Sequence, residues 1–304
     1  MTQYRYTLEK YNGAKTRFKC PSCNKTNAFT RYIDIETNEY LNENVGCCNR
    51  VVKCGYHYKP KQYFQDSNLN FKKPMFSNKA IFRPIEKPKP TFISKSIVKQ
   101  SLTFLNNNFL SFLEQFWNKE TALMLANKYN IGTSNHWNGS TIFWQVDSNQ
   151  NVRSGKVMLY DSNCKRVKKP YNHINWMHKV LKLDNFNLEQ CFFGEHLINQ
   201  NFFKPIAIVE SEKTAIIASV FLPEFIWLAC GSVNNLNESR SKVLQGRSVV
   251  LFPDLGCFDL WNSKIPKMTK LASFRTSTLL EDKATDLERA NGYDLADYLL
   301  RFKL

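Results

Sequence analysis

Short apolar runs alternate with helical segments between residues 205 and 274, and this alternation constrains the fold more than any other feature. The runs PIAIVE, FIWLAC, SVVLFPD and KLASF have the length and composition of buried strands. The segments between them, SEKTAIIASVFL, NESRSKVLQ and FDLWNSKI, have helical character. Continuous apolar strands separated by helices predict an α/β fold with a parallel sheet covered on both faces.

Acidic residues follow two of these strands. Glu210 ends the first run and Asp254 ends the third, so a parallel sheet would bring both to its carboxyl edge, where ligands bind in such folds. Two carboxylates at one edge suit a hard divalent cation such as Mg²⁺. The turn ACGSVNN, after the second strand, can offer backbone amides to phosphate. The alternative is that each acid caps the helix that follows it.

Five of the nine cysteines fall between residues 20 and 54, which indicates a zinc site rather than a disulfide framework. The motif CPSC is a tight knuckle that points two thiolates at one tetrahedral zinc. The predicted ligands are Cys20, Cys23, Cys48 and Cys54, with Cys47 or His57 as substitutes in the second pair. Four protein ligands leave no open position for chemistry, so the zinc is expected to be structural.

A change in amino-acid composition after the cysteine-rich region indicates a domain boundary. Residues 71–92 contain four prolines among six basic residues, as expected of an extended tether. Helical spacing follows, with one helix predicted to end at Gly132, and residues 140–161 predict a β-hairpin. The predicted organisation is a zinc ribbon at 1–65, a basic linker at 66–94, a helical and hairpin segment at 95–204, and the α/β domain at 205–304.

Basic residues outnumber acidic ones by 42 to 26, and the formal charge of +16 favours polyanionic partners. The hairpin and the segment CKRVKKPYNHINW interleave cations with aromatic rings, which suits single-stranded DNA. The candidate DNA-binding residues are Arg153, Lys156, Lys165, Arg166, Lys168, Lys169, Tyr171 and Trp176. The alternatives are a solvated basic loop and two aromatic rings that belong to the hairpin core.

No run of 18 uncharged apolar residues occurs, and the N-terminus lacks the apolar segment of a signal peptide. We therefore expect no membrane association and a cytoplasmic location.

The order of these parts resembles bacterial DnaG-like primases, which combine a zinc ribbon with a Toprim domain. The most specific pieces are the CPSC knuckle and the Toprim pattern in IAIVESEKTAIIAS and VVLFPD. Four segments look closer still to the small primase-like Toprim proteins of bacterial mobile elements. They are CNRVVKCGYHYKPKQYF, PYNHINW, CFFGEHL and GYDLADYLL. The resemblance covers most of the chain.

The resemblance implies roles for particular acids. Glu210 matches the Toprim glutamate, an acid/base and metal neighbour, and Asp254 matches the first Asp of the family's Asp-x-Asp. The turn NGYDLADYL implies that Asp294 and Asp297 also face the ion, which would be Mg²⁺ or Mn²⁺. Lys213 would reach a phosphate, unless it is an ordinary solvated helix lysine.

The sequence departs from the family at Gly256, which takes the place of the second Asp. Asp259 is a candidate replacement, one turn into the next helix. A site with fewer carboxylates binds Mg²⁺ less tightly and relies more on substrate phosphates. Where the geometry follows the family, a Gly256→Asp change is expected to tighten Mn²⁺ binding.

The predicted function is that of a primase-like protein that binds single-stranded DNA and joins nucleoside triphosphates in mobile-element replication. No GxxxxGK[ST] loop occurs in the chain, so any helicase is expected to be a separate protein. Two alternatives remain open: a catalytically weak or inactive DNA-binding replication accessory, and a Toprim nuclease that uses the same acids on water.

Overall fold

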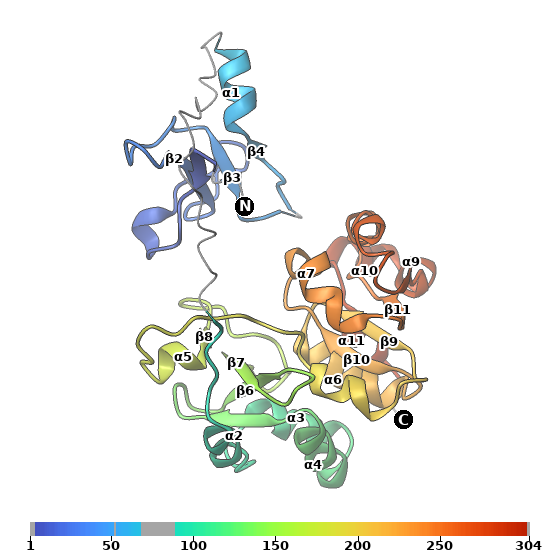
Figure 1. The fold of residues 1–304 in the computed structure, drawn as a ribbon. Coiled ribbons are helices and arrows are strands. Elements are labelled where there is room, and N and C mark those ends of the chain that lie inside the picture. The colour runs from blue at the N-terminus through green and yellow to red at the C-terminus, as the bar shows by residue number, and fades with distance from the viewer. Residues whose placement is uncertain (1–3, 52, 68–88, 303–304) are drawn as a thin grey trace. The chain divides into compact units, whose positions relative to one another are not determined.

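The computed structural model describes residues 4–51, 53–67 and 89–302 (Figure 1). The chain divides into two compact units, residues 1–86 and 87–304. This division falls inside the stretch predicted as a basic tether, residues 66–94, most of which lies outside the described residues.

The N-terminal unit is a small antiparallel sheet with strand order β1-β2-β3-β4. Its elements are β1 (Tyr6–Leu8), the 3-10 helix η1 (Ala14–Thr16), β2 (Phe29–Asp34), β3 (Gly46–Cys48), β4 (His57–Tyr58) and α1 (Pro60–Asp66). Its buried apolar cluster contains little besides Ala28, Phe29 and two cysteines, Cys20 and Cys48. So small an apolar core needs additional stabilisation, and bound metals commonly provide it.

The first part of the larger unit is an antiparallel sheet with strand order β5-β6-β7-β8. Its strands are β5 (Ile131–Ser134), β6 (Ser140–Val146), β7 (Val152–Met158) and β8 (Ile174–Trp176), and its helices are α2 (Lys95–Ser101), α3 (Asn108–Phe116), α4 (Lys119–Lys128) and α5 (Met177–Val180). Strands β6 and β7 form the predicted hairpin.

The prediction that a helix ends at Gly132 was wrong. Helix α4 ends at Lys128, and Asn130, with φ of 51°, adopts the left-handed conformation that often follows a helix. Gly132 lies in β5, where a side chain would collide with Ser101 and Trp144. The indole Nε1–H of Trp144 donates a hydrogen bond to Ser101 Oγ at 2.9 Å, so this glycine allows close packing rather than a turn.

The second part of the larger unit is a parallel sheet with strand order β10-β9-β11-β12, flanked by helices, as the sequence predicted. Its strands are β9 (Ile206–Val209), β10 (Ile226–Ala229), β11 (Ser248–Leu251) and β12 (Ser273–Thr276). Its α-helices are α6 (Glu212–Phe221), α7 (Glu238–Ser241), α8 (Phe258–Asn262), α9 (Leu279–Lys283), α10 (Asp286–Asn291) and α11 (Leu295–Leu299). The unit's 3-10 helices are η2 (Glu195–Gln200), η3 (Val233–Asn235), η4 (Lys242–Leu244) and η5 (Ile265–Lys267).

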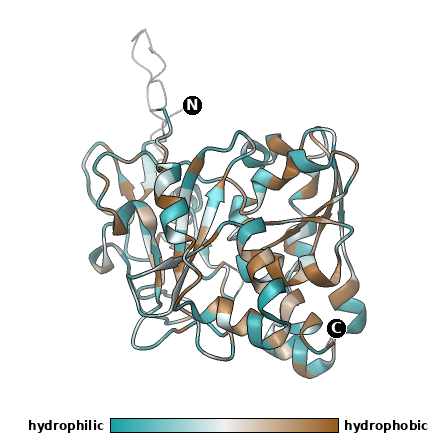
Figure 2. Ribbon diagram, turned by 90° about the horizontal axis from the view of Figure 1, so that it is seen from below, coloured by the Kyte–Doolittle hydropathy of each residue, from teal (hydrophilic) through white to brown (hydrophobic). Residues whose placement is uncertain are grey.

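The apolar strands β9 and β10 are buried along their whole length, and they belong to an apolar cluster that also contains residues of α6. In Figure 2 the strands of this unit are mostly apolar in colour, whereas the loops around them are mostly hydrophilic. Both sheets contribute to one continuous apolar cluster. The predicted division at residues 204/205 separates the two sheets, and it remains a proposal about how the chain is organised.

Within the described part of the chain, no helix combines the length and the apolar character needed to cross a bilayer.

Candidate metal and nucleic-acid site

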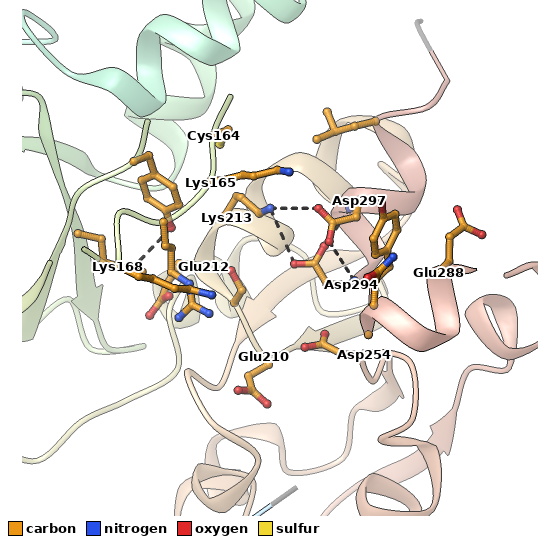
Figure 3. Close-up of a pocket in the computed structure, with 18 of the residues that line it drawn as sticks. Cys164, Lys165, Lys168, Glu210, Glu212, Lys213, Asp254, Glu288, Asp294 and Asp297 are labelled. Atoms are coloured by element: carbon orange, nitrogen blue, oxygen red, sulfur yellow. Dashed lines mark hydrogen bonds and ion pairs between the residues drawn. The ribbon is translucent and has the colours of Figure 1, made fainter. Parts of the chain in front are cut away.

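The carboxyl edge of the parallel sheet opens into a cavity of about 1090 Å³. Glu210 follows β9 directly, Asp254 lies three residues after β11, and both half-buried side chains line this cavity (Figure 3). The strands run parallel and in register, so their carboxyl ends meet at one edge. The topology therefore brings together two acids that are 44 positions apart in the sequence.

Neither of these acids caps a helix. The N-cap of α6 is Ser211 and that of α8 is Cys257, and no side-chain capping bond is made at either position. Among the described residues, no side chain forms a hydrogen bond or ion pair with the carboxylate of Asp254. The helix-cap alternative is therefore excluded for both acids.

Asp294 and Asp297 reach the same cavity from α11, but both carboxylates already have partners. They form a capping box, in which Asp294 Oδ1 accepts the N–H of Asp297 at 2.9 Å and Asp297 Oδ2 accepts the N–H of Asp294 at 3.3 Å. The hydroxyl of Thr214 donates to Asp294 Oδ2 at 2.9 Å. These contacts attach α11 to α6, so the two aspartates have a structural role whether or not they face an ion.

Lys213 is neither a solvated helix lysine nor a free cation. Its side chain is 14% exposed, and its Nζ lies 3.5 Å from Asp297 Oδ1 and 3.9 Å from Asp294 Oδ2. Burial lowers the pKa of this ammonium, but the charges of the two aspartates outweigh burial and the net shift is upward. In Figure 3, dashed lines join Lys213 to both aspartates and none reaches Glu210 or Asp254.

A second ion pair in the cavity had no signal in the sequence. The ammonium of Lys156, on β7, lies 3.0 and 3.2 Å from the carboxylate oxygens of Glu212, the first residue of α6. Glu212 is 2% exposed, so this pair is largely shielded from water. It joins the antiparallel sheet to the helix that begins beside Glu210. Lys156 was predicted to contact DNA, and the structure shows it paired with Glu212; the DNA contact stays a prediction.

Glu210 and Asp254 line the cavity without an ion-pair partner among the described residues. Burial raises the pKa of Asp254 well above its usual range, and the negative charges of Asp294 and Glu210 raise it further. Burial also raises the pKa of Glu210, although the positive charges of Lys156 and Arg166 oppose the shift. A divalent cation relieves such repulsion, and carboxylates are its preferred ligands, so this donor set fits Mg²⁺ or Mn²⁺.

Gly256 does not face these acids. It lines a separate cavity of about 310 Å³ together with Phe258, Asp259, Thr278 and Glu281. Gly256 has φ of +79°, in the left-handed region, and the space around its Cα is open. Asp259 lies in the first turn of α8, as predicted, but it belongs to this second cavity and does not replace the missing carboxylate.

The predicted basic patch divides into two groups. Lys165, Arg166 and Lys168 are exposed and line the carboxylate cavity, whereas Arg153 pairs with Asp147 at 2.6 Å. Lys169 is exposed and is not among the residues that line this cavity.

The loop that carries the three cavity cations is shaped by Asp161. Its Oδ1 accepts the N–H groups of Asn163 and Lys165, both at 2.9 Å. This local turn places the cations on a defined loop beside the acids.

The two predicted stacking residues also differ. Tyr171 is 57% exposed, and its ring stacks on His173 with centroids 4.5 Å apart. Trp176 is the last residue of β8 and is half-buried. Tyr171 is therefore the better placed of the two to meet a base.

The cysteines of the N-terminal unit form a compact cluster. The Sγ atoms of Cys20, Cys23, Cys48 and Cys54 all lie within 4.8 Å of one another. The Sγ distances are 3.8 Å between Cys20 and Cys54 and 4.0 Å between Cys23 and Cys48. A tetrahedral zinc with Zn–S bonds of about 2.3 Å requires sulfur separations of about 3.8 Å, so these residues fit the ion.

The substitute ligands are not needed. His57 Nε2 lies 2.8 Å from the hydroxyl of Tyr32, and the thiol of Cys47 donates to the carbonyl of Cys48 at 3.7 Å. Neither belongs to the four-cysteine group.

Comparison with protein-family models gives two matches. A zinc beta-ribbon finger model matches residues 4–69, which supports a structural zinc at the four cysteines. A model of DUF6371, a domain of unknown function, matches residues 107–255. No curated protein matches the chain.

Solved structures similar to this chain include several bacterial and phage primases. The primase fragment of the bacteriophage T7 primase-helicase protein is 12% identical, with 91% of this chain and 98% of that chain covered and a TM-score of 0.37. The zinc-binding and RNA polymerase domains of the Aquifex aeolicus primase are 12% identical, covering 98% and 78%, with a TM-score of 0.40. The RNA polymerase domain of Mycobacterium tuberculosis primase DnaG is 11% identical, covering 65% and 80%, with a TM-score of 0.39.

Proposed function

We propose that this chain is a primase-like Toprim protein of a bacterial mobile element that binds single-stranded DNA in the cytoplasm. With Mg²⁺ or Mn²⁺ it joins nucleoside triphosphates into an RNA primer, and a separate helicase unwinds the template. The observation that carries the proposal is one cavity with two chemically different walls. Glu210 and Asp254 form the acidic wall, and Lys165, Arg166 and Lys168 form the basic one.

The two walls suit the two charges of a nucleotidyl transfer. The acidic wall would hold a divalent cation, which neutralises phosphate charge and positions the attacking hydroxyl. The basic wall would hold the phosphates of the template or of the incoming nucleotide. Burial raises the pKa of Glu210, which makes this carboxyl better suited to take and return a proton than an exposed one.

The zinc ribbon supports the DNA-binding part of the proposal. Its surface combines cations with aromatic rings: the guanidinium of Arg31 lies 3.9 Å from the ring centroid of Phe18, and that of Arg17 lies 4.9 Å from that of Tyr11. Tyr11 is 64% exposed. Positive charge beside an exposed ring is the pattern that holds phosphates and stacks bases of a single strand.

One observation favours the weaker alternative, a DNA-binding accessory with little or no catalysis. Gly256 supplies no second carboxylate to this cavity, and Lys213 already offsets part of the charge of Asp294 and Asp297. Such a protein would bind the strand through the same basic wall.

The proposal is tested by incubating the purified protein with single-stranded DNA, Mg²⁺ or Mn²⁺ and labelled nucleoside triphosphates. We expect primer extension, and a loss of about 100-fold or more in Asp254→Asn and Glu210→Gln, because each removes a charge that holds the reacting phosphates. Asp259→Asn is the matched control, since this acid lies in the other cavity.

The same assay separates the three functions. Binding without extension supports the accessory, and loss of the single-stranded DNA itself supports the nuclease. Extension that persists at the wild-type rate in Asp254→Asn would contradict the proposed site.

A further inference from the structure

The charges in the carboxylate cavity are arranged unequally. Two lysines already pair with three of its acids: Lys156 with Glu212, and Lys213 with Asp294 and Asp297. Glu210 and Asp254 form no ion pair within the part of the chain that the structure describes. The protein therefore compensates part of the acidic charge on one side of the site by itself and leaves Glu210 and Asp254 without an ion-pair partner.

Lys213 occupies an unusual position in this arrangement. It is the second residue of α6, it lies three positions after Glu210, and its side chain is largely buried inside the cavity. It contacts both members of the α11 capping box at their carboxylate oxygens, where a metal ion would also bind. An ammonium and a divalent cation that share one group of carboxylates repel each other strongly at such short range.

We propose that Lys213 is a built-in counter-ion that competes with the divalent cation and keeps the site's affinity for free metal low. This inference rests on the proposed metal-dependent function. It assigns Lys213 a role other than phosphate contact: the ammonium stabilises the aspartates of α11 when no metal is bound. The fold then does not depend on the metal, and metal binding requires Lys213 to give up part of its contact with Asp294 and Asp297.

A metal titration tests the competition. The full chain, with its zinc retained and no nucleotide or DNA present, is titrated with Mn²⁺, and free Mn²⁺ is followed by its electron paramagnetic resonance signal. We expect Lys213→Gln to bind Mn²⁺ about tenfold more tightly than wild type, since it removes the repulsion of one ammonium a few ångström from a dication. Adding Asp254→Asn to this variant should abolish the gain.

Lys165→Gln is the matched control. It makes the same change of charge on the same cavity, but Lys165 is exposed and water screens its effect. We expect its Mn²⁺ affinity to stay within about threefold of wild type. An equal gain in both variants, or no gain in Lys213→Gln, would overturn the proposal.

A second measurement uses wild type and does not depend on the folding of a variant. Amine acetylation followed by mass spectrometry reports how accessible each lysine is. We expect Lys213 to be protected without divalent metal and to become more reactive at saturating Mg²⁺, whereas Lys165 reacts equally in both conditions. Unchanged protection of Lys213 would contradict the competition. Neither measurement detects primer synthesis. A protein that makes no primers can therefore still give the result expected of the competition in both.

Discussion

The cysteine cluster and the carboxylate cavity are both suited to bind metal, but they differ in how the charges of the metal-binding groups are compensated. The four thiols form a closed group whose sulfur spacing matches one tetrahedral ion, and they make up much of the small core around Phe29. The cavity acids lie after β9 and β11 and at the starts of α6 and α11, and Lys213 and Lys156 neutralise part of their charge. The cysteine cluster thus makes zinc part of the first region's core, whereas under our proposal the internal cations make metal dispensable for the fold of the second region.

The largest expected effect comes from opening the thiol cluster. Cys48→Ser should remove the zinc and unfold residues 4–67, because structural zinc contributes an apparent free energy of about 10–16 kcal/mol to folding. Residues 89–302 should keep their hydrogen-exchange protection, since their core is separate. Elemental analysis and hydrogen exchange measure the two effects.

Cys47→Ser is the matched control for this change. Cys47 is the preceding residue in β3, but it lies outside the cluster, so zinc content should stay at one per chain. Stoichiometric zinc in Cys48→Ser would contradict the predicted ligand set and remove the contrast between the two regions.

An intermediate effect is expected from the basic wall, which has no counterpart in the closed thiol site. Replacing Lys165, Arg166 and Lys168 by Gln should lower the slope of log affinity for single-stranded DNA against log salt by about 0.7 per lost phosphate contact, or roughly 2 in total. Arg153→Gln should leave the slope unchanged, because this side chain already pairs with Asp147. Equal slopes in the triple variant and wild type would indicate that the loop is an ordinary solvated surface that makes no phosphate contacts.

The smallest effect is expected at Gly256, and here the structure reverses the expectation from the sequence. Gly256→Asp should not tighten Mn²⁺ binding, because this position lines the cavity of Asp259 and Glu281 rather than that of Asp254. It should instead destabilise the larger unit by about 1 kcal/mol, the usual cost of a side chain in the left-handed region.

Gly256→Ala separates the two causes, since it has the same backbone strain without the charge. Calorimetry and an Mn²⁺ titration of both variants measure the outcome. A clear gain in Mn²⁺ affinity in Gly256→Asp alone would show that the loop moves to bring this position to the carboxylates.

Much of the fold followed from local pattern. The alternation of apolar strands and helices predicted the parallel sheet, and the parallel edge predicted that Glu210 and Asp254 would meet. Helix ends were harder to place: α4 ends before Asn130 rather than at Gly132, because asparagine also adopts the left-handed conformation. The motif CPSC directly predicted two of the four clustered cysteines, Cys20 and Cys23, because two cysteines at that spacing can bind one tetrahedral zinc.

The sequence by itself determined the type of each ligand and the strand end at which each acid lies, because both depend on neighbours only a few residues away. Only the tertiary structure decided which of these charges are already neutralised. Lys213 meets Asp294, and Lys156 meets Glu212, across long sequence separations. Electrostatic energy depends on distance in space and on shielding from water, and neither is visible along the chain.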